Sequence, residues 1–583
     1  MEKARYETDV LIVGSGPAGS TTSALLSKYG IKNMVVTKYG WLANSPRAHI
    51  TNQRTMEVFR DLGIEEEVIE KAVPQELMGN NVFCTSLAGE ELGRLYSWGN
   101  HPNRMADYTL ASPTKICDIP QNLAEPIIVG AAARTGSKFK FDTEYLSHVQ
   151  DDNGVTVTCR DRLADEEFTV RAKYLVGADG GNSKVAENLG LPYEGEMGVG
   201  GSMNIVFKMD LSKYVAHRPS VLYWVLQPGS NVGGIGMGLV RMVRPWNEWL
   251  IVWGYDINDG PPEVNDDLAK EIAFKLVGDD SIPIEITQTS TWTVNHCYAK
   301  KISEGRVFCM GDAIHRHPPS NGLGSNTSIQ DAFNLSWKLA KVIKGEANES
   351  LLESYQDERG PIAKQIVDRA NKSIEEFGPI FQSLGLGEDI KPEQMRANME
   401  KLKDNNPTSE KQREDLRKAI ALKSYEFNCH GVEMNQRYNS NATIADGSHE
   451  EEFKRDKELY YQASTRPGAH LPHVWLGKNG HKVSTLDVSG KGEFTLFTSI
   501  GGEKWIEAAK ELSKSLGINI NTVQIGPDRD YTDLYGAWAE VRDIKDSGCL
   551  LIRPDYHIAF RAKEVSQNAE SDLKNAFEKI LGK

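Results

Sequence analysis

The sequence predicts an α/β protein in which a domain that begins with a parallel βαβ unit is interrupted by an inserted mixed β-sheet. Three glycine-rich segments, at residues 14–19, 177–183 and 305–315, support this prediction because each adjoins or contains an apolar run that is typical of a buried strand. Aromatic-rich runs at residues 221–226 and 249–253 predict strands of the inserted sheet.

The first glycine-rich segment has the arrangement that a dinucleotide phosphate requires. Residues 10–36 predict a strand, a turn, a helix over 17–29 and a second strand. Gly14 permits the tight turn, Gly16 lets the backbone approach a pyrophosphate, and Gly19 allows the helix to pack closely on the strand. We therefore expect this turn to bind a dinucleotide.

Pro17 and Ala18 open the helix, whose free N–H groups and positive dipole end would face the phosphates. About 20 residues further on, such units usually carry an acidic residue that binds the ribose. Thr37 and Lys38 occupy that position here. We therefore expect a hydroxyl or backbone group of these residues to make the ribose contact.

The third segment predicts a second contact region for the same ligand. Asp312 follows an apolar strand at residues 306–310 and is placed to accept hydrogen bonds from ribose or ribityl hydroxyls. A long helix is predicted over about residues 326–344, and its N-terminus would stabilise negative charge on the ligand. The residues that present this helix end are Gly322, Gly324, Ser325 and Asn326.

These segments resemble those of the phenol hydroxylases among the class A flavoprotein monooxygenases. Further stretches at residues 46–57, 117–122, 241–247 and 463–473 carry the same resemblance, which extends over essentially the whole chain. The resemblance implies a Rossmann-like FAD-binding domain of the GxGxxG type, an inserted β-sheet domain for the substrate and a thioredoxin-like C-terminal domain. It also implies FAD as cofactor, NADPH or NADH as co-substrate, and dioxygen and a small phenol as substrates.

The FAD-binding domain is expected to be discontinuous, over residues 1–80, 105–200 and 290–375. The remaining assignments are a substrate-binding β-sheet domain at 81–104 and 201–289, a solvated helical connector at 376–425, and a thioredoxin-like domain at 426–583.

The C-terminal domain is expected to contain a βαβ element. Residues 485–487, 494–498 and 518–523 predict strands, and residues 502–516 predict a helix. The domain has no CxxC pair and therefore no dithiol chemistry. We expect it to have a structural role, in the contacts of a dimer.

The reaction that the resemblance implies is ortho-hydroxylation of a phenol, in particular a chlorinated one, to a catechol through a flavin hydroperoxide. Phenol itself and 2-hydroxybiphenyl remain alternative substrates. An unperturbed phenol has a pKa of about 10, so a base is needed to raise the electron density of the ring. His49 is the candidate base, since an imidazole titrates in a suitable range and the resemblance places a catalytic histidine there. The alternative role of His49 is a hydrogen bond to the backbone near Pro46.

The resemblance implies further contacts with the cofactor. Arg47 and Gln121 are expected to contact the flavin, with a surface or capping role as the alternative. Asp118 either contacts the flavin or orients a neighbouring side chain. Asp179 is expected to serve both the FAD phosphates and the nicotinamide nucleotide, and otherwise to be an ordinary aspartate at the end of a strand.

Three more residues are candidates for the site. Pro319 is expected to present its carbonyl to the substrate, or to set the turn into the Gly322 loop. Trp224 is expected to line an apolar pocket. Arg241 is a candidate contact to the nucleotide or the flavin, with a surface arginine as the alternative. No metal site is expected.

Composition and charge indicate which partners and which location to expect for the protein. The 583 residues carry a formal net charge of −14 without a basic patch, which argues against a nucleic-acid partner. The chain has no apolar run of about 18 residues and no apolar signal core at its start, so a cytoplasmic protein without membrane contact is expected. Its seven cysteines are expected to be reduced thiols. A homodimer or homotetramer is expected.

Two other functions are alternatives to this interpretation. A flavin halogenase would need a Trp-x-Trp-x-Ile-Pro element, and the tryptophans at residues 246–253 have the wrong spacing for it. A flavin-free binding module of the same fold is the alternative outside enzymes.

Overall fold

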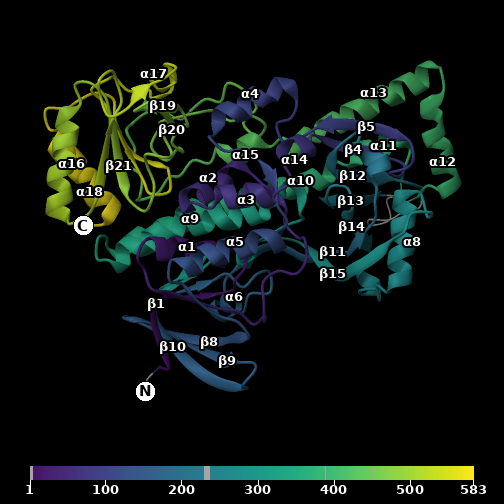
Figure 1. Cartoon of the computed structure of the whole chain (residues 1–583), viewed down its shortest axis with the longest axis horizontal. Helices are drawn as coiled ribbons and strands as arrows, with labels where there is room; N and C mark the ends of the chain where they lie inside the picture. Colours follow the sequence, from purple (N-terminus) through teal and green to yellow (C-terminus); the bar gives the residue numbers. More distant parts are fainter. Residues whose placement is uncertain (1–3, 229–236, 388, 450) are drawn as a thin grey trace.

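The computed structural model of the chain describes residues 4–228, 237–387, 389–449 and 451–583. Within these residues the chain forms two eight-stranded sheets and a four-stranded C-terminal sheet, together with smaller ribbons. In Figure 1 the C-terminal sheet, in yellow, and the second large sheet lie at opposite ends of the molecule. Helix α9 (Gly324–Ile343) runs across the centre between them.

The first sheet carries all three glycine-rich segments at one edge. Its strands β10, β1 and β2 are parallel, and β17 is parallel to β10. Val13 pairs with Gly177 and Gly177 pairs with Cys309, so these strands end at the same edge, where parallel sheets bind ligands. The strands are β1 (Tyr6–Val13), β2 (Asn33–Val36), β7 (Lys138–Lys140), β8 (Thr143–Asp151), β9 (Gly154–Asp161), β10 (Glu166–Gly177), β16 (Ser303–Glu304) and β17 (Val307–Cys309).

The predicted βαβ unit is confirmed. Helix α1 (Pro17–Lys28) follows β1, and the chain turns at Gly30, with a φ of +78°, into β2. Gly14 has a φ of +104°, and a Cβ atom there would collide with the carbonyl of Ala178. A Cβ atom on Gly19 would collide with the carbonyl of Gly14. Both positions therefore require glycine.

The second sheet is mixed, as predicted for the insert. β4 and β12 are parallel, whereas β12 and β13, like β11 and β15, are antiparallel. A bulge interrupts the pairing of β11 with β15 between Glu196 and Gly200. The strands are β4 (Asn80–Cys84), β5 (Glu91–Tyr96), β11 (Tyr193–Lys208), β12 (Ser220–Leu226), β13 (Met237–Arg244), β14 (Glu248–Tyr255), β15 (Glu285–Ala299) and β18 (His315–Arg316).

Helix α1 packs against α5, α9 and strand β2 of the first sheet, and further helices follow along the chain. These helices are α2 (Gln53–Leu62), α3 (Glu65–Lys71), α4 (Pro102–Ala111), α5 (Gln121–Arg134), α6 (Lys184–Leu189), α7 (Ser212–Val215), α8 (Asp266–Val277), α10 (Glu353–Glu375), α11 (Gly378–Leu384), α12 (Pro392–Glu400), α13 (Pro407–Leu422), α14 (Ser424–Phe427) and α15 (His430–Met434). In the described part of the chain, none of the helices combines the length and apolar character that crossing a bilayer requires.

The segment predicted as a connector is helical, but it is less solvated than expected. Leu416, Ala419 and Ile420 on one face of α13 are buried, and this face packs on β5. Their i, i+3, i+4 spacing is typical of a buried helix face. The high charge content of the segment concealed this spacing in the sequence.

The C-terminal region contains the predicted βαβ element. β21 (Phe494–Thr498) and β22 (Ile520–Gln524) pair in parallel and are joined by α16 (Glu503–Leu516). The antiparallel pair β24–β25 and helix α18 complete a thioredoxin-like arrangement. The other elements are β19 (Trp475–Lys478), β20 (His481–Ser484), β23 (Thr532–Asp533), α17 (Ala537–Val541), β24 (Cys549–Ile552), β25 (Ile558–Ala562) and α18 (Ala569–Leu581).

The strand predicted at residues 485–487 is wrong, because the chain turns there. Strand β20 ends at Ser484, whose N–H donates to the Asp487 carboxylate at 2.8 Å. Asp487 also pairs with Arg60 of α2 at 2.7 Å. An aspartate that satisfies the nearby backbone favours a turn over a strand.

A buried ionic network joins the C-terminal region to the central helices. The Glu358 carboxylate on α10 accepts hydrogen bonds from Lys338 of α9 at 2.7 Å and from Arg553 at 2.5 Å. Arg553 also pairs with Asp555 at 2.6 Å, and all four side chains are at most 2% exposed. Burial lowers the pKa of Lys338 to about 8, against the raising effect of Glu358. The network ties α9 and α10 to the turn that precedes β25.

Candidate active site

His49 lies directly before a short ribbon that brings two distant segments together. The ribbon pairs β3 (Ile50–Thr51) with β6 (Cys117–Asp118), and the Ile119 N–H donates to the His49 carbonyl at 2.8 Å. This pairing places Nδ1 of His49 against Oδ2 of Asp118. The Asp118 side chain is fully buried, whereas that of His49 is 17% exposed. Only the histidine is therefore open to a ligand.

Arg241 completes this cluster from the second sheet. It lies in β13, with Nη2 3.8 Å from Oδ1 of Asp118, and its Nη1 donates to the carbonyl of Pro46. The arginine is 2% exposed, so the alternative of a surface arginine is wrong. Nε and Nη2 of Arg241 and Oδ1 of Asp118 have no hydrogen-bond partner in the described residues. Buried polar atoms of this kind are explained by an ordered water, an ion or a functional role.

The electrostatics of the cluster favour a neutral imidazole. Burial lowers the pKa of His49, Arg241 lowers it further, and both outweigh Asp118, which raises it. The pKa of Asp118 is also lowered, since His49 and Arg241 together outweigh the raising effect of burial. An ionised carboxylate can only accept a hydrogen bond, so Nδ1 of His49 carries the proton. Nε2 is then left as a proton acceptor.

Asn326 connects strand β3, which follows His49, to the turn that precedes α9. Its Oδ1 accepts from the Asn52 N–H at 3.0 Å, and its Nδ2 donates to the carbonyls of Ile50 at 2.8 Å and Gly322 at 2.6 Å. Asn326 is 1% exposed. Its side chain is therefore occupied by the protein, which leaves the backbone of Asn326 for a cofactor contact. Gly324 and Ser325 form the first residues of α9.

The glycine-rich turn before α1 is open to a ligand. The atom nearest to the position of a Cβ on Gly16 is Oε1 of Glu125, at 3.9 Å, so the backbone is accessible. Pro17, Ala18 and Gly19 form the first turn of α1. The N–H groups of such a turn have no partner within the helix.

The residues at the expected ribose position differ in exposure. Thr37 is buried, and its backbone pairs with Lys140 at 3.1 Å and Thr143 at 2.8 Å. Lys38 is exposed, and its carbonyl accepts from Arg162 at 2.5 Å. The exposed groups of Lys38 are thus open to a ligand at this position, whereas Thr37 is shielded.

Other residues that the sequence singled out lie around the same edge. Asp312 and Pro319 are exposed, as is Arg47, whose carbonyl accepts from the Gln121 N–H at 2.9 Å. The Gln121 side chain donates to Glu125 at 2.5 Å.

Asp179 and Trp224 are engaged within the protein. The Asp179 carboxylate accepts from Ser183 Oγ at 2.5 Å and from the Val185 N–H at 3.2 Å. Trp224 is 8% exposed, donates to Asn81 at 3.1 Å and packs on Phe377 with a ring distance of 4.7 Å. Both therefore have clear structural roles.

Two supporting residues were missed from the sequence, Asp331 of α9 and Arg359 of α10. The Asp331 carboxylate accepts from the Gly311 N–H at 3.1 Å and from His315 at 2.9 Å through Oδ2, and from Arg359 at 2.7 Å through Oδ1. Both side chains are at most 1% exposed. Asp331 could have been found from the sequence, because it is an acidic residue among the apolar positions of the helix predicted over about residues 326–344.

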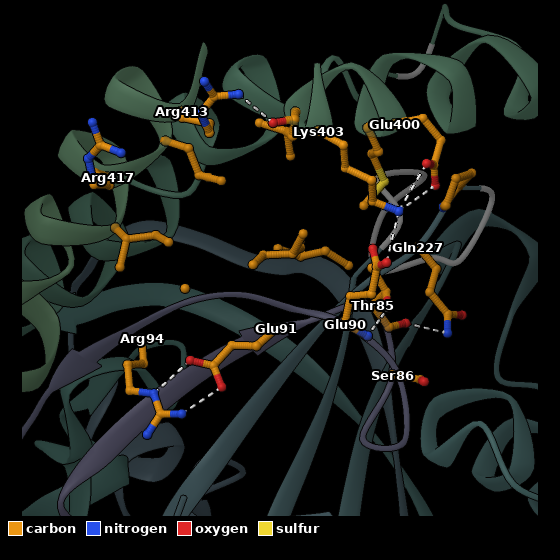
Figure 2. A pocket seen from close by; sticks show the side chains of 18 of the residues that line it. Thr85, Ser86, Glu90, Glu91, Arg94, Gln227, Glu400, Lys403, Arg413 and Arg417 are labelled. Carbon is orange, nitrogen blue, oxygen red and sulfur yellow. Dashed lines mark hydrogen bonds and ion pairs between the residues drawn. The ribbon is translucent and has the colours of Figure 1, made fainter. Parts of the chain in front are cut away.

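A cavity of about 1160 Å³ lies apart from these residues, between the second sheet and the connector helices (Figure 2). Arg413 and Arg417 of α13 lie on one side of it, and Glu91 and Arg94 of β5 lie on the other. No residue predicted for the site lines this cavity. It therefore does not belong to the His49 cluster.

Comparison with known proteins identifies the family of this chain. Residues 7–370 match a family described as FAD binding domain, and residues 464–583 match one described as aromatic-ring hydroxylase, C-terminal. The chain belongs to the FAD-binding domain family. It is 57% identical to a 2,4-dichlorophenol 6-monooxygenase of Cupriavidus pinatubonensis, over 99% of this chain and 97% of that protein. It is 50% identical to a phenol 2-monooxygenase of a Pseudomonas species, over 97% and 92%.

Solved structures of the family have the same fold. The flavin-dependent monooxygenase PieE in complex with FAD and substrate is 40% identical and superposes with a TM-score of 0.95, with 100% of both chains covered. A ternary complex of aklavinone-11 hydroxylase with FAD and aklavinone is 27% identical, with a TM-score of 0.81 over 100% of both chains. The present chain is an FAD-dependent monooxygenase, which excludes the flavin-free binding module.

Asp331→Asn should weaken FAD binding. The asparagine keeps the shape but loses the charge and turns an NH₂ group towards one of three donors, so the Gly311–Asp312 turn loses its support. We expect the Kd for FAD to rise about tenfold, measured by fluorescence titration of the apoprotein. Asp368→Asn removes an exposed pair with Lys364 on α10 and is the control. An unchanged FAD affinity would contradict the role of Asp331.

Proposed function

We propose that this monooxygenase converts a phenol into the corresponding catechol with dioxygen and NADPH or NADH, and that chlorinated phenols are its first candidate substrates. One oxygen atom enters the ring ortho to the hydroxyl and the other leaves as water, while the nicotinamide supplies both electrons. The observation that carries the proposal is the neutral, partly exposed imidazole of His49 held by buried Asp118. Relatives that are named for 2,4-dichlorophenol and phenol oxidation, at 57% and 50% identity, support the substrate class.

The residues at the edge of the first sheet fit FAD. The open backbone at Gly16 and the free N–H groups at the start of α1 suit its pyrophosphate. Thr37 or Lys38 would contact the adenosine ribose, and the exposed Asp312 carboxylate would accept from the ribityl chain. The Gly322–Asn326 backbone at the start of α9 would meet the electron-rich edge of the flavin, with Arg47 and Gln121 nearby. When bound, FAD accepts a hydride and activates dioxygen.

His49 is proposed to take the proton of the phenol through Nε2. A phenol has a pKa of about 10, and its phenolate carries more electron density at the ortho carbon than the neutral ring. Asp118 fixes the tautomer and orientation of the imidazole, and Arg241 helps to keep it neutral before the reaction. This arrangement keeps the base available when substrate arrives.

Other residues are proposed to complete the pocket. The Pro319 carbonyl would accept a hydrogen bond from the substrate, since the residue is exposed at the start of the short turn before α9. Trp224 would form an apolar wall through its aromatic cluster. Asp179 would act on the nucleotides through the turn that it stabilises. A homodimer or homotetramer in the cytoplasm completes the proposal.

The direct test is catechol formation against NADPH consumption by the purified holoenzyme. With 2,4-dichlorophenol we expect close to one catechol per NADPH, and slow NADPH consumption without a phenol, because a closed site protects the activated oxygen from water. A panel of phenol, alkylphenols and 2-hydroxybiphenyl identifies the preferred ring by the same ratio. NADPH consumption without catechol for every member would contradict the proposal.

His49→Ala should uncouple the reaction. FAD should still bind, since the proposed flavin contacts lie elsewhere, but catechol formation should fall by about 10²-fold or more, because proton transfer loses its base. NADPH oxidation should fall much less. Product analysis beside NADPH absorbance measures both rates, and His217→Ala, at an exposed histidine, is the control. Unchanged coupling would exclude His49 as the base.

Arg241→Met should shift the pH dependence of hydroxylation. The base works only when neutral, so the rate falls as pH drops through the pKa of His49. That pKa is below the ordinary value of about 6.5, and Arg241 is one cause of the lowering. Its removal should move the acidic limb of kcat/KM to higher pH. Arg94→Met, at an exposed arginine of β5, should leave the limb in place. If the acidic limb of kcat/KM does not move in Arg241→Met, Arg241 does not lower the pKa of His49.

A further inference from the structure

The cavity between the second sheet and the connector helices, shown in Figure 2, has no part in the proposed reaction. Its volume is about 1160 Å³, whereas pockets for small organic molecules typically measure about 300–1,000 Å³. Its walls come from β5, the end of β12, α8 and the helices α12 and α13. The cavity is therefore larger than a single phenol ring requires.

The described residues that line this cavity carry more positive than negative charge. Six cationic side chains stand against three acidic ones, namely Arg94, Lys275, Arg396, Lys403, Arg413 and Arg417 against Glu90, Glu91 and Glu400. The excess is opposite in sign to the net charge of −14 of the whole chain. A cleft lined mainly by one sign of charge concentrates ions of the other sign. The lining therefore favours an anion.

The three carboxylates are already paired, which leaves four of the cations without one. Glu91 accepts two hydrogen bonds from Arg94, at 2.6 and 2.7 Å. Lys403 pairs with Glu90 at 2.8 Å and with Glu400 at 2.9 Å. In the part of the chain that the structure describes, no carboxylate pairs with the other four cations, which are Lys275, Arg396, Arg413 and Arg417.

Arg413 is held in place at this cavity without losing its charge to a partner. Its Nη1 donates to the backbone carbonyls of Leu402 at 2.6 Å and Asp404 at 2.9 Å. Arg417 lies four residues further along α13, so the two guanidinium groups come from the same face of the helix. Figure 2 shows both arginines on the side of the cavity opposite Arg94 of β5. A pair of neighbouring guanidinium groups is thus available to one anion.

Apolar side chains of β5 and of the segment that contains α12 and α13 form the rest of the lining. They are Leu92, Leu95, Met399, Leu402, Leu416 and Ile420. Leu92, Leu95 and Leu402 are only partly buried, so apolar surface remains open to a ligand. Covering such surface removes it from water, which favours the binding of an apolar group.

We propose that this cavity binds an organic anion whose apolar body is larger than one ring, of the fatty-acid type. The anionic head would meet Arg413 and Arg417, and the body would lie on the leucines of β5 and on Leu402. Arginine suits a carboxylate because its guanidinium can donate two parallel hydrogen bonds to it. No residue of the His49 cluster lines the cavity, so the inference does not depend on the proposed reaction.

The test is isothermal titration calorimetry of the holoenzyme with laurate, kept below its micelle concentration. We expect saturable binding of laurate. Dodecyl maltoside, which has the same tail without a charge, should bind much more weakly, as should acetate, which has the charge without a tail. The single-ring compound 2,4-dichlorophenol should not displace laurate.

Arg417→Met should raise the Kd for laurate about tenfold or more, because a charge-assisted contact to the carboxylate is lost. Ala421→Glu, at an exposed residue that lines the cavity, should weaken laurate binding by repulsion. Lys418→Met is the matched control. It removes an exposed lysine of the same helix that pairs with Glu414 at 2.6 Å and does not line the cavity.

Absence of laurate binding, or equal affinity for laurate and dodecyl maltoside, would overturn the inference. An unchanged Kd for laurate in Arg417→Met would also overturn it. Displacement of laurate by 2,4-dichlorophenol, or a competitive rise in the KM for that phenol, would place laurate in the catalytic pocket and reject this site. Failure of the proposed function would appear differently, as no catechol from any phenol, and calorimetry alone would then decide whether the cavity binds laurate.

Discussion

The arrangement of the active-site segments depends on one buried carboxylate, that of Asp331. Its oxygens accept hydrogen bonds from the Gly311 N–H, from His315 and from Arg359, so the 311–315 segment and helix α10 meet at one charge on α9. A buried carboxylate is tolerated only when its oxygens are satisfied, and losing one donor would leave it costly. The Gly311–Asp312 turn, strand β18 and helix α10 are therefore held together, and α9 carries the group that holds them.

The same helix links this turn to the base and to the C-terminal region. At its N-terminal end, Asn326 bonds to the backbone on both sides, at Ile50 next to His49 and at Gly322 in the flavin loop. Further along, Lys338 reaches Glu358, which also binds Arg553. A displacement of either end would break several buried hydrogen bonds at once. This gives the C-terminal region a structural role towards the active site, although it contributes none of the proposed catalytic groups.

The chemistry of His49 depends on a balance of opposing effects. Asp118 alone would make the imidazole more basic and favour its protonated form, whereas burial and Arg241 favour the neutral form and prevail. Asp118 can therefore orient the ring without protonating it. The partly exposed imidazole then keeps Nε2 free for the proposed proton transfer, while its carboxylate partner stays shielded from water.

The sequence by itself determined the elements whose signals are local. Gly14, Gly16 and Gly19, with the apolar runs around them, were sufficient for the βαβ unit, because turn sterics and strand periodicity act over a few residues. Resemblance pointed to His49. The orienting role of Asp118, the burial of Arg241 and the junction at Asp331 were decided only by the tertiary structure. These features join residues far apart in the chain, and a local pattern does not record which charged side chain will be buried against which partner. Only the shared edge of β1, β10 and β17 and the packing of α9 bring those charges together.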